Sequence, residues 1–96
     1  MGGEIALALH ELEEILPATG EIDEALREEE LLKSLQTFLS ALPTRERSIF
    51  VLRYFHTQST KEIAAQFGMR EAAVLKTLSR TRKRLREYLE KEGFAV

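Results

Sequence analysis

A helix-start signal and a helix-stop signal lie close together in the second half of the chain. In Ser59-Thr60-Lys61-Glu62 the serine oxygen can accept a hydrogen bond from the Glu62 amide, while the glutamate side chain reaches back to the Ser59 amide. Gly68 lacks a Cβ and suits the left-handed turn that follows a helix end. The inward residues between these signals are Ile63, Ala64 and Phe67. The sequence therefore predicts one short helix between Ser59 and Gly68.

A longer helix is predicted from about Glu71 to Glu92, with Gly93 as its stop. Its buried stripe comprises Val74, Leu78, Thr81, Leu85 and Leu89. Two helices joined by a three-residue turn that opens with glycine have the layout of a helix-turn-helix unit, and small Ala64 and Ala65 allow the helices to cross closely.

The outer face of the long helix is basic and carries short side chains near its N-terminal end. A helical wheel places Ala72, Lys76, Ser79, Arg80 and Lys83 opposite the buried stripe. Such a face can approach base edges in the major groove of DNA. The later cluster of Arg82, Lys83, Arg84 and Arg86 is suited to phosphates, although a solvated basic helix end is its simpler explanation when it is taken alone.

Two further helices are predicted upstream of this unit. Asp23 is a plausible N-cap for the first, and Pro43 ends it. Its apolar stripe contains Leu26, Leu32, Leu35, Phe38, Leu39 and Leu42. Thr44 can cap the next helix, whose apolar face contains Ile49, Phe50, Leu52 and Phe55.

Residues 1–22 are ambiguous, because the apolar positions from Ile5 to Leu16 fit both strand and helix spacing. Pro17, Thr19 and Gly20 then break the pattern. We therefore expect a linker or short N-terminal helix over 1–22 and one helical domain over 23–93. Removing 1–22 is predicted to leave the fold intact and to strengthen DNA binding, since it deletes five acidic side chains and no lysine or arginine. The expected fold is all-α, a four-to-five-helix bundle with a C-terminal helix-turn-helix.

Charge is divided unevenly along the chain, despite a net charge of -2. Residues 1–42 hold ten acids against Arg27 and Lys33, a balance of -8, whereas residues 43–96 hold twelve bases against six acids, a balance of +6. This division indicates a half that faces nucleic acid and an acidic half with another role, although pairing between acidic and basic helices explains the charges equally well.

The composition argues against several classes of protein. Without cysteine there is no disulfide framework or thiolate metal site, and neither His10 nor His56 has a cluster of carboxylates arranged around it at ligand spacing, so we expect no metal and no other cofactor. Ser59 and Thr60 are better explained as helix caps than as nucleophiles, so no catalytic residue and no enzyme activity are expected. No membrane span or targeting segment is evident, which favours a cytoplasmic protein.

Several segments together resemble region 4 of the sigma-70 family of RNA polymerase sigma factors, most closely its small extracytoplasmic-function-like members. They are Leu42-Pro43-Thr44-Arg45-Glu46-Arg47, Phe50 to Tyr54, Glu62-Ile63-Ala64, Phe67-Gly68 and Arg80-Thr81-Arg82-Lys83-Arg84-Leu85. The resemblance covers about Leu35 to Leu89. It implies a winged-helix-like DNA-binding fold without a wing, and a chain that corresponds to the C-terminal part of a longer sigma factor, without the promoter-melting region 2.

The resemblance also implies function and partners. The domain is expected to read the minus-thirty-five element of double-stranded promoter DNA and to dock on the β flap of RNA polymerase core. An anti-sigma factor, if one exists, is a further expected partner. We expect a monomer that has no membrane partner. The predicted DNA contacts are Thr60, Lys61, Arg70, Ala72, Leu75, Lys76, Ser79, Arg80, Lys83 and Arg84. Two alternatives remain open: a response-regulator-type helix-turn-helix regulator, and an interaction module in which the acidic half binds an anti-sigma factor.

Overall fold

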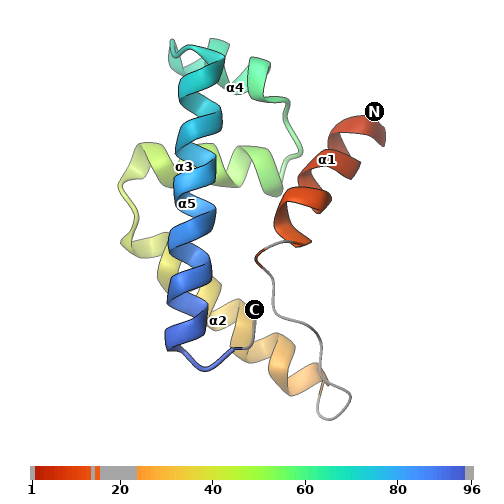
Figure 1. The fold of residues 1–96 in the computed structure, drawn as a ribbon, viewed down its shortest axis with the longest axis vertical. Helices are drawn as coiled ribbons and strands as arrows, with labels where there is room; N and C mark the ends of the chain where they lie inside the picture. The colour runs from red at the N-terminus through yellow and green to blue at the C-terminus, as the bar shows by residue number, and fades with distance from the viewer. Residues whose placement is uncertain (1, 14, 16–23, 95–96) are drawn as a thin grey trace.

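The computed structural model describes residues 2–13, 15 and 24–94, and every regular element in these ranges is a helix. In chain order these are α1 (Gly2–Glu13), α2 (Glu24–Ala41), α3 (Thr44–Tyr54), α4 (Thr60–Phe67) and α5 (Glu71–Lys91). Figure 1 shows α5 running along the long axis of the molecule, with α2 beside its C-terminal half, α3 behind its middle and α4 near its N-terminal end. The all-α prediction is confirmed for the described part of the chain.

The predicted signals at the ends of α4 are present in the structure. The Ser59 hydroxyl accepts a hydrogen bond from the Glu62 amide at 3.1 Å, and the Ser59 amide donates to the Glu62 carboxylate at 3.1 Å. Gly68 adopts a left-handed φ of 63°, and the Met69 amide donates to the Ala64 carbonyl at 2.9 Å. These bonds satisfy backbone groups that the helix ends would otherwise leave unpaired.

The core forms along α5, where α2, α3 and α4 pack on it. Its most deeply buried side chains are Ile49, Phe50, Ile63, Val74, Leu78, Leu85 and Leu89. Thr81 is also buried, and its hydroxyl donates to the Thr77 carbonyl at 2.8 Å, so this polar group does not remain unpaired in the apolar interior. The buried stripe predicted for α5 is thus confirmed at all five positions.

Three details of the upstream helices differ from prediction. Thr44 is the first residue of α3, so the N-cap is Pro43, which has no side-chain acceptor. Leu32 is 58% exposed, because α2 turns Leu31 and Leu35 toward the core instead. Phe55 is also 58% exposed, because it follows the last turn of α3. The predicted break at Pro17–Gly20, the predicted cap Asp23 and the side chain of Leu26 lie outside what the structure describes.

The N-terminal segment is a helix that packs on α3 and supplies Ala8, only 2% exposed, to the core. Ile15, just beyond α1, is buried as well. The segment therefore contributes two side chains to the core, and the inner face of α1 also carries the acidic Glu4 and Glu11, which bind a buried arginine of α3. Within the described ranges, none of the helices combines the length and apolar character needed to cross a bilayer.

Candidate nucleic-acid interface

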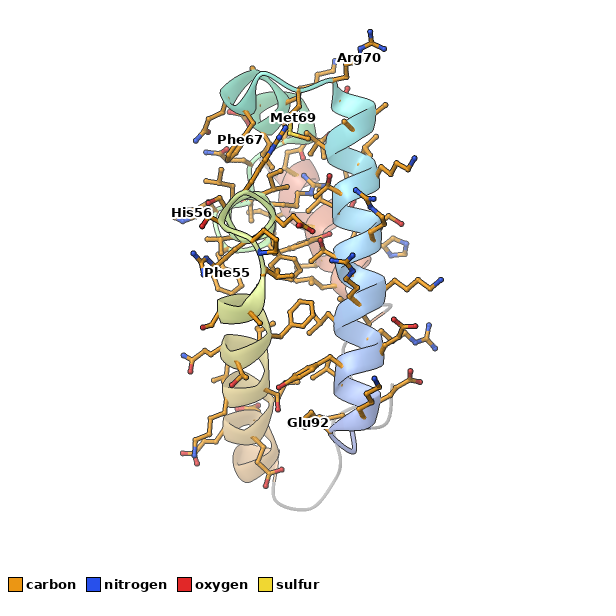
Figure 2. The ribbon with its side chains drawn as sticks, turned by 90° about the vertical axis from the view of Figure 1, so that its left-hand side faces the viewer. Phe55, His56, Phe67, Met69, Arg70 and Glu92 are labelled. Atoms are coloured by element: carbon orange, nitrogen blue, oxygen red, sulfur yellow. The ribbon has the colours of Figure 1, made fainter. Side chains whose placement is uncertain are left out.

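The turn between α4 and α5 fixes how the two helices present their surfaces. It consists of Gly68, Met69 and Arg70, and Met69 packs against the core while Arg70 is exposed. Figure 2 shows Arg70 extending from the N-terminal end of α5, away from the body of the molecule. Arg70 occupies the N-cap position of α5 without forming a side-chain cap, so its guanidinium is not engaged by the helix end.

The outer face of α5 is open to solvent along its N-terminal half. Ala72, Lys76, Ser79, Arg80 and Lys83, the residues predicted to lie opposite the buried stripe, are all exposed. Leu75 is exposed as well and borders this face. The structure therefore brings three cations, one hydroxyl and two apolar side chains together on one accessible helical surface, which can present both charge and close contact to a ligand.

The start of α4 lies against the start of α5. The Thr60 hydroxyl donates a 2.6 Å hydrogen bond to the Glu71 carboxylate, which joins the first residues of the two helices. Thr60 is only half-buried, whereas the neighbouring Lys61 is exposed. Of these two predicted DNA contacts, Thr60 thus already serves to hold α4 on α5, while Lys61 carries an accessible charge beside the helix-turn-helix.

Arg84 lies on the flank of α5 that faces α3. Its guanidinium lies 3.6 Å from the Glu46 carboxylate, and its side chain remains 58% exposed. An exposed pair of this kind contributes little to stability and is easily exchanged for another anion. Arg84 therefore remains accessible to a phosphate group.

A shallow groove beside this flank holds a basic residue that the sequence analysis did not assign to the interface. The groove runs between the start of α3 and α5 and is lined by Pro43, Arg45, Glu46, Ile49, Met69, Ala73, Lys76, Thr77 and Arg80. Arg45 is exposed in the first turn of α3 and faces the same groove as Lys76 and Arg80. The helical wheel of α5 carries no information about α3, so only the tertiary packing reveals this third cation.

A buried charge on α3 was also missed. Arg53 is only 3% exposed and donates to Glu4 at 2.8 Å, to Glu11 at 3.2 Å and to the Gln58 carbonyl at 2.9 Å. Burial by itself lowers the pKa of Arg53, but the hydrogen bonds to Glu11 and Glu4 outweigh it and the pKa is raised. Arg53 thus stays charged, and α1 supplies the carboxylates that make its burial tolerable.

Tyr54 links this buried pair to α5. Its hydroxyl donates to Glu11 at 3.0 Å and accepts from Arg82 at 2.7 Å, and Arg82 lies 3.8 Å from Glu11. Burial raises the pKa of Tyr54 to about 12, although the neighbouring Arg82 acts in the opposite direction. Arg82, part of the basic cluster recognised in the sequence, is therefore partly neutralised in this structure.

A second groove, on the side of α2, has an entirely apolar lining. Its residues are Leu12, Leu31, Leu32, Leu35, Phe50, Phe55, Leu85 and Leu89, which come from α1, α2, α3 and α5. Leu32 and Phe55, the two residues that the structure exposes against expectation, form part of its lining. Exposed apolar side chains gathered in a groove are typical of a surface that binds another protein.

Neither histidine belongs to a group of possible metal ligands. His10 and His56 are both exposed, and the described residues contain no cluster of three histidine, cysteine, aspartate or glutamate side chains able to hold a metal ion.

The chain is similar to known sigma factors. Residues 32–85 match the family model described as "Sigma-70, region 4". RNA polymerase sigma factor SigF of Mycobacterium tuberculosis is 36% identical over 76 residues, which cover 79% of this chain and 29% of the relative. RNA polymerase sigma-E factor of Streptomyces avermitilis is 45% identical over 56 residues, or 58% of this chain and 31% of the relative.

A third relative, the probable RNA polymerase sigma factor RfaY of Xanthomonas campestris, is 37% identical over 73 residues, which cover 76% of this chain and 18% of the relative. The chain thus spans less than a third of the length of each of these relatives. No solved structure matches the chain significantly.

Proposed function

This chain belongs to the sigma-70 region 4 family, and from that premise we propose that it recognises the minus-thirty-five promoter element with α5 while it docks on the β flap of RNA polymerase. Membership supports a role in DNA binding during transcription initiation. The observation that carries the finer assignment is the accessible outer face of α5, on which Lys76, Arg80 and Lys83 are all exposed.

The arrangement of this face suits the major groove of DNA. Small Ala72 and Ser79 allow the N-terminal half of α5 to approach base edges closely, and Arg80 can donate two hydrogen bonds to a guanine. Lys61, Arg45 and Arg84 lie around this face on α4, α3 and the far part of α5, where phosphates of a duplex would run. We therefore assign Lys76 and Arg80 to base contacts and these three flanking cations to the backbone.

DNA selection followed by a salt titration tests this proposal. Duplexes selected from random DNA should share one sequence motif, and affinity for them should fall steeply as salt rises, because several lysines and arginines displace counterions from phosphates. Replacing Lys61 by Ala should lower affinity for selected and scrambled duplexes alike. Selection without enrichment, or binding that is insensitive to salt, would contradict the proposal.

The apolar groove is the surface that we assign to the β flap. Its lining is formed by leucine and phenylalanine side chains of four helices, and exposed Glu28, Glu29 and Glu30 lie on α2 close to Leu31 and Leu32. An apolar segment of the flap with basic flanking residues would complement both the lining and this acidic edge.

Substitution at the exposed edge of the groove tests the docking assignment. Leu32→Asp and Phe55→Asp should weaken binding to RNA polymerase core without unfolding the domain, because both side chains are exposed. Leu7→Asp introduces the same charge at an exposed position on α1 that does not line the groove, and should leave binding unchanged. Equal effects of the three substitutions would argue against this groove.

We further propose that the domain acts as a monomer. Response-regulator-type helix-turn-helix domains usually dimerise through their last helix, but here Leu85 and Leu89 of α5 are buried within the same chain. The exposed residues of that region include Lys83, Arg84 and Arg86, which repel a second copy. A solution mass that stays constant between low and high protein concentration is expected, and a concentration-dependent dimer would favour the regulator alternative.

A further inference from the structure

Two guanidinium groups and a phenolic hydroxyl converge on the Glu11 carboxylate between α1, α3 and α5. The Glu11 carboxylate accepts hydrogen bonds from the Arg53 guanidinium at 3.2 Å and from the Tyr54 hydroxyl at 3.0 Å. Arg82 lies 3.8 Å from the same carboxylate oxygen and donates to Tyr54. Two guanidinium groups and a phenol thus surround one carboxylate, and charge-assisted donors of this kind bind a phosphate group equally well.

This site adjoins the surface proposed to face DNA. Arg53 donates to the carbonyl of Gln58, which directly precedes the cap of α4, and Arg82 belongs to the basic cluster of α5. Figure 1 shows α1 on the flank of the molecule beside α3 and the connector to α4. The Glu11 carboxylate of α1 thus lies 3.8 Å from a cation of the α5 cluster that is suited to phosphates.

α1 joins the domain through these polar contacts and through Ala8 and Leu12, which pack on the core. Ala8 is buried, but the outward side chains Ile5, Leu7 and Leu9 are 48%, 53% and 56% exposed. The Gln58 side-chain oxygen, next to the carbonyl that accepts from Arg53 in the same residue, is buried without a hydrogen-bond partner among the described residues. Arg82 and Glu11 remain 19% and 23% exposed, so solvent and other anions can reach this side of the site, whereas the buried Arg53 requires an anionic partner.

We propose that α1 is a displaceable cover, in which Glu11 is the internal ligand of an anion site that a DNA backbone phosphate takes over when the duplex binds. The inference rests on the proposed DNA-binding function. It assigns Arg53, Tyr54 and Arg82 to the phosphate-binding surface of the open form. Displacement of α1 also moves the carboxylates of Glu4 and Glu11 away from the duplex, so the cover lowers affinity for DNA while it is closed.

Hydrogen exchange of the whole chain, with and without a selected duplex, tests the displacement directly. DNA should slow exchange of the amides of α4 and α5 and speed exchange of the amides of α1 (Gly2–Glu13). Slower or unchanged exchange in α1, together with protection of α5, would show that the domain binds DNA with the cover closed and would overturn the inference alone. Absence of protection anywhere would overturn the proposed function, and the inference with it.

A matched pair of variants tests the role of Glu11. Glu11→Gln and Glu13→Gln remove the same charge from the same helix, but the Glu13 side chain is exposed and has no hydrogen bond or ion pair among the described contacts. Glu11→Gln should tighten binding to the duplex about three- to tenfold, and Glu13→Gln clearly less. Equal effects would mean that only net charge matters and would overturn the competition at this site. Circular dichroism of both variants checks that α2 to α5 remain folded.

Discussion

The Thr60 hydroxyl donates a 2.6 Å hydrogen bond to Glu71, so the first residue of α4 is joined to the first residue of α5. Both helices belong to the helix-turn-helix, and their relative position determines which side chains can enter a groove together. A residue that the sequence marks only as a possible DNA contact thus also contributes to the geometry of the interface.

Replacing Thr60 by Val should therefore lower the stability of the domain by about 1 kcal/mol, because the Glu71 carboxylate loses a partly buried donor. Thr37→Val is the matched control, since the Thr37 hydroxyl donates only to the Lys33 carbonyl of its own helix and is exposed. Urea unfolding of the two variants provides the comparison. Similar losses in both would show that the bond between α4 and α5 contributes nothing measurable.

The capping box of α4 gives a second prediction. Ser59→Ala should cost about 1 kcal/mol, because the Glu62 amide loses its acceptor, whereas Glu62→Gln retains a side chain that can accept from the Ser59 amide and should cost less. Thermal unfolding of the two variants, at a pH where Glu62 is ionised, measures the difference. A larger loss for Glu62→Gln would contradict this ranking.

The same box makes stability depend on acid. The hydrogen bond from the Ser59 backbone, followed by that with its side chain, lowers the pKa of Glu62. The contribution of ionised Glu62 to the stability of the fold is therefore fully present above the ordinary pKa of glutamate, and it is lost as the pH falls through the lowered pKa. Wild type should lose more stability on acidification than Glu62→Gln, which does not titrate at this position.

The buried hydroxyl of Tyr54 should make the domain less stable at high pH. Burial raises its pKa to about 12, above the usual value near 10, so the folded state resists ionisation of this hydroxyl. The contribution of the Tyr54 hydroxyl to stability is fully present below the pKa that tyrosine has in the unfolded chain. It is lost as the pH rises toward the raised pKa of the folded state. Urea unfolding at about pH 9 and about pH 11 should show a smaller decrease for Tyr54→Phe than for wild type. An equal decrease in both would assign the effect to other groups.

Two leucines of α5 that are close in sequence differ sharply in burial, with Leu78 at 1% exposed and Leu75 at 47%. Leu78→Ala should destabilise the domain by about 2–5 kcal/mol, because it leaves a cavity in the core cluster to which Leu78 belongs. Leu75→Ala should change stability by less than about 0.5 kcal/mol. Chemical denaturation measures both changes in stability. Comparable losses of stability would show that the inner and outer faces of α5 are wrongly assigned.

Local signals explain why much of the fold was predictable. The serine and glycine at the ends of α4 act within a few residues, and the apolar period of α5 identifies its inner face at Val74, Leu78, Thr81, Leu85 and Leu89 without reference to any partner. Thr44 shows the limit of such signals, because a cap depends on which residue leaves the helical conformation first, and here that residue is Pro43.

Contacts between distant segments explain what was missed. Arg53 belongs by sequence to an amphipathic helix where an arginine would normally be solvated, and only the approach of Glu4 and Glu11 from α1 allows its burial. Arg45 joins Lys76 and Arg80 through the packing of α3 on α5. Neither relationship has a fixed spacing along the chain that a sequence pattern could reveal.

The central claim is that the outer face of α5 reads DNA sequence, and the measurement that tests it most directly compares Arg80→Ala with Arg84→Ala. Both positions are exposed on α5, but Arg80 is assigned to base contacts and Arg84 to the backbone. Affinities for a selected duplex and its scrambled version are measured at one salt concentration. Arg80→Ala should reduce the preference for the selected duplex by about 1–3 kcal/mol, whereas Arg84→Ala should weaken binding to both duplexes alike. An unchanged preference in Arg80→Ala would contradict the assignment of this face as the reading surface.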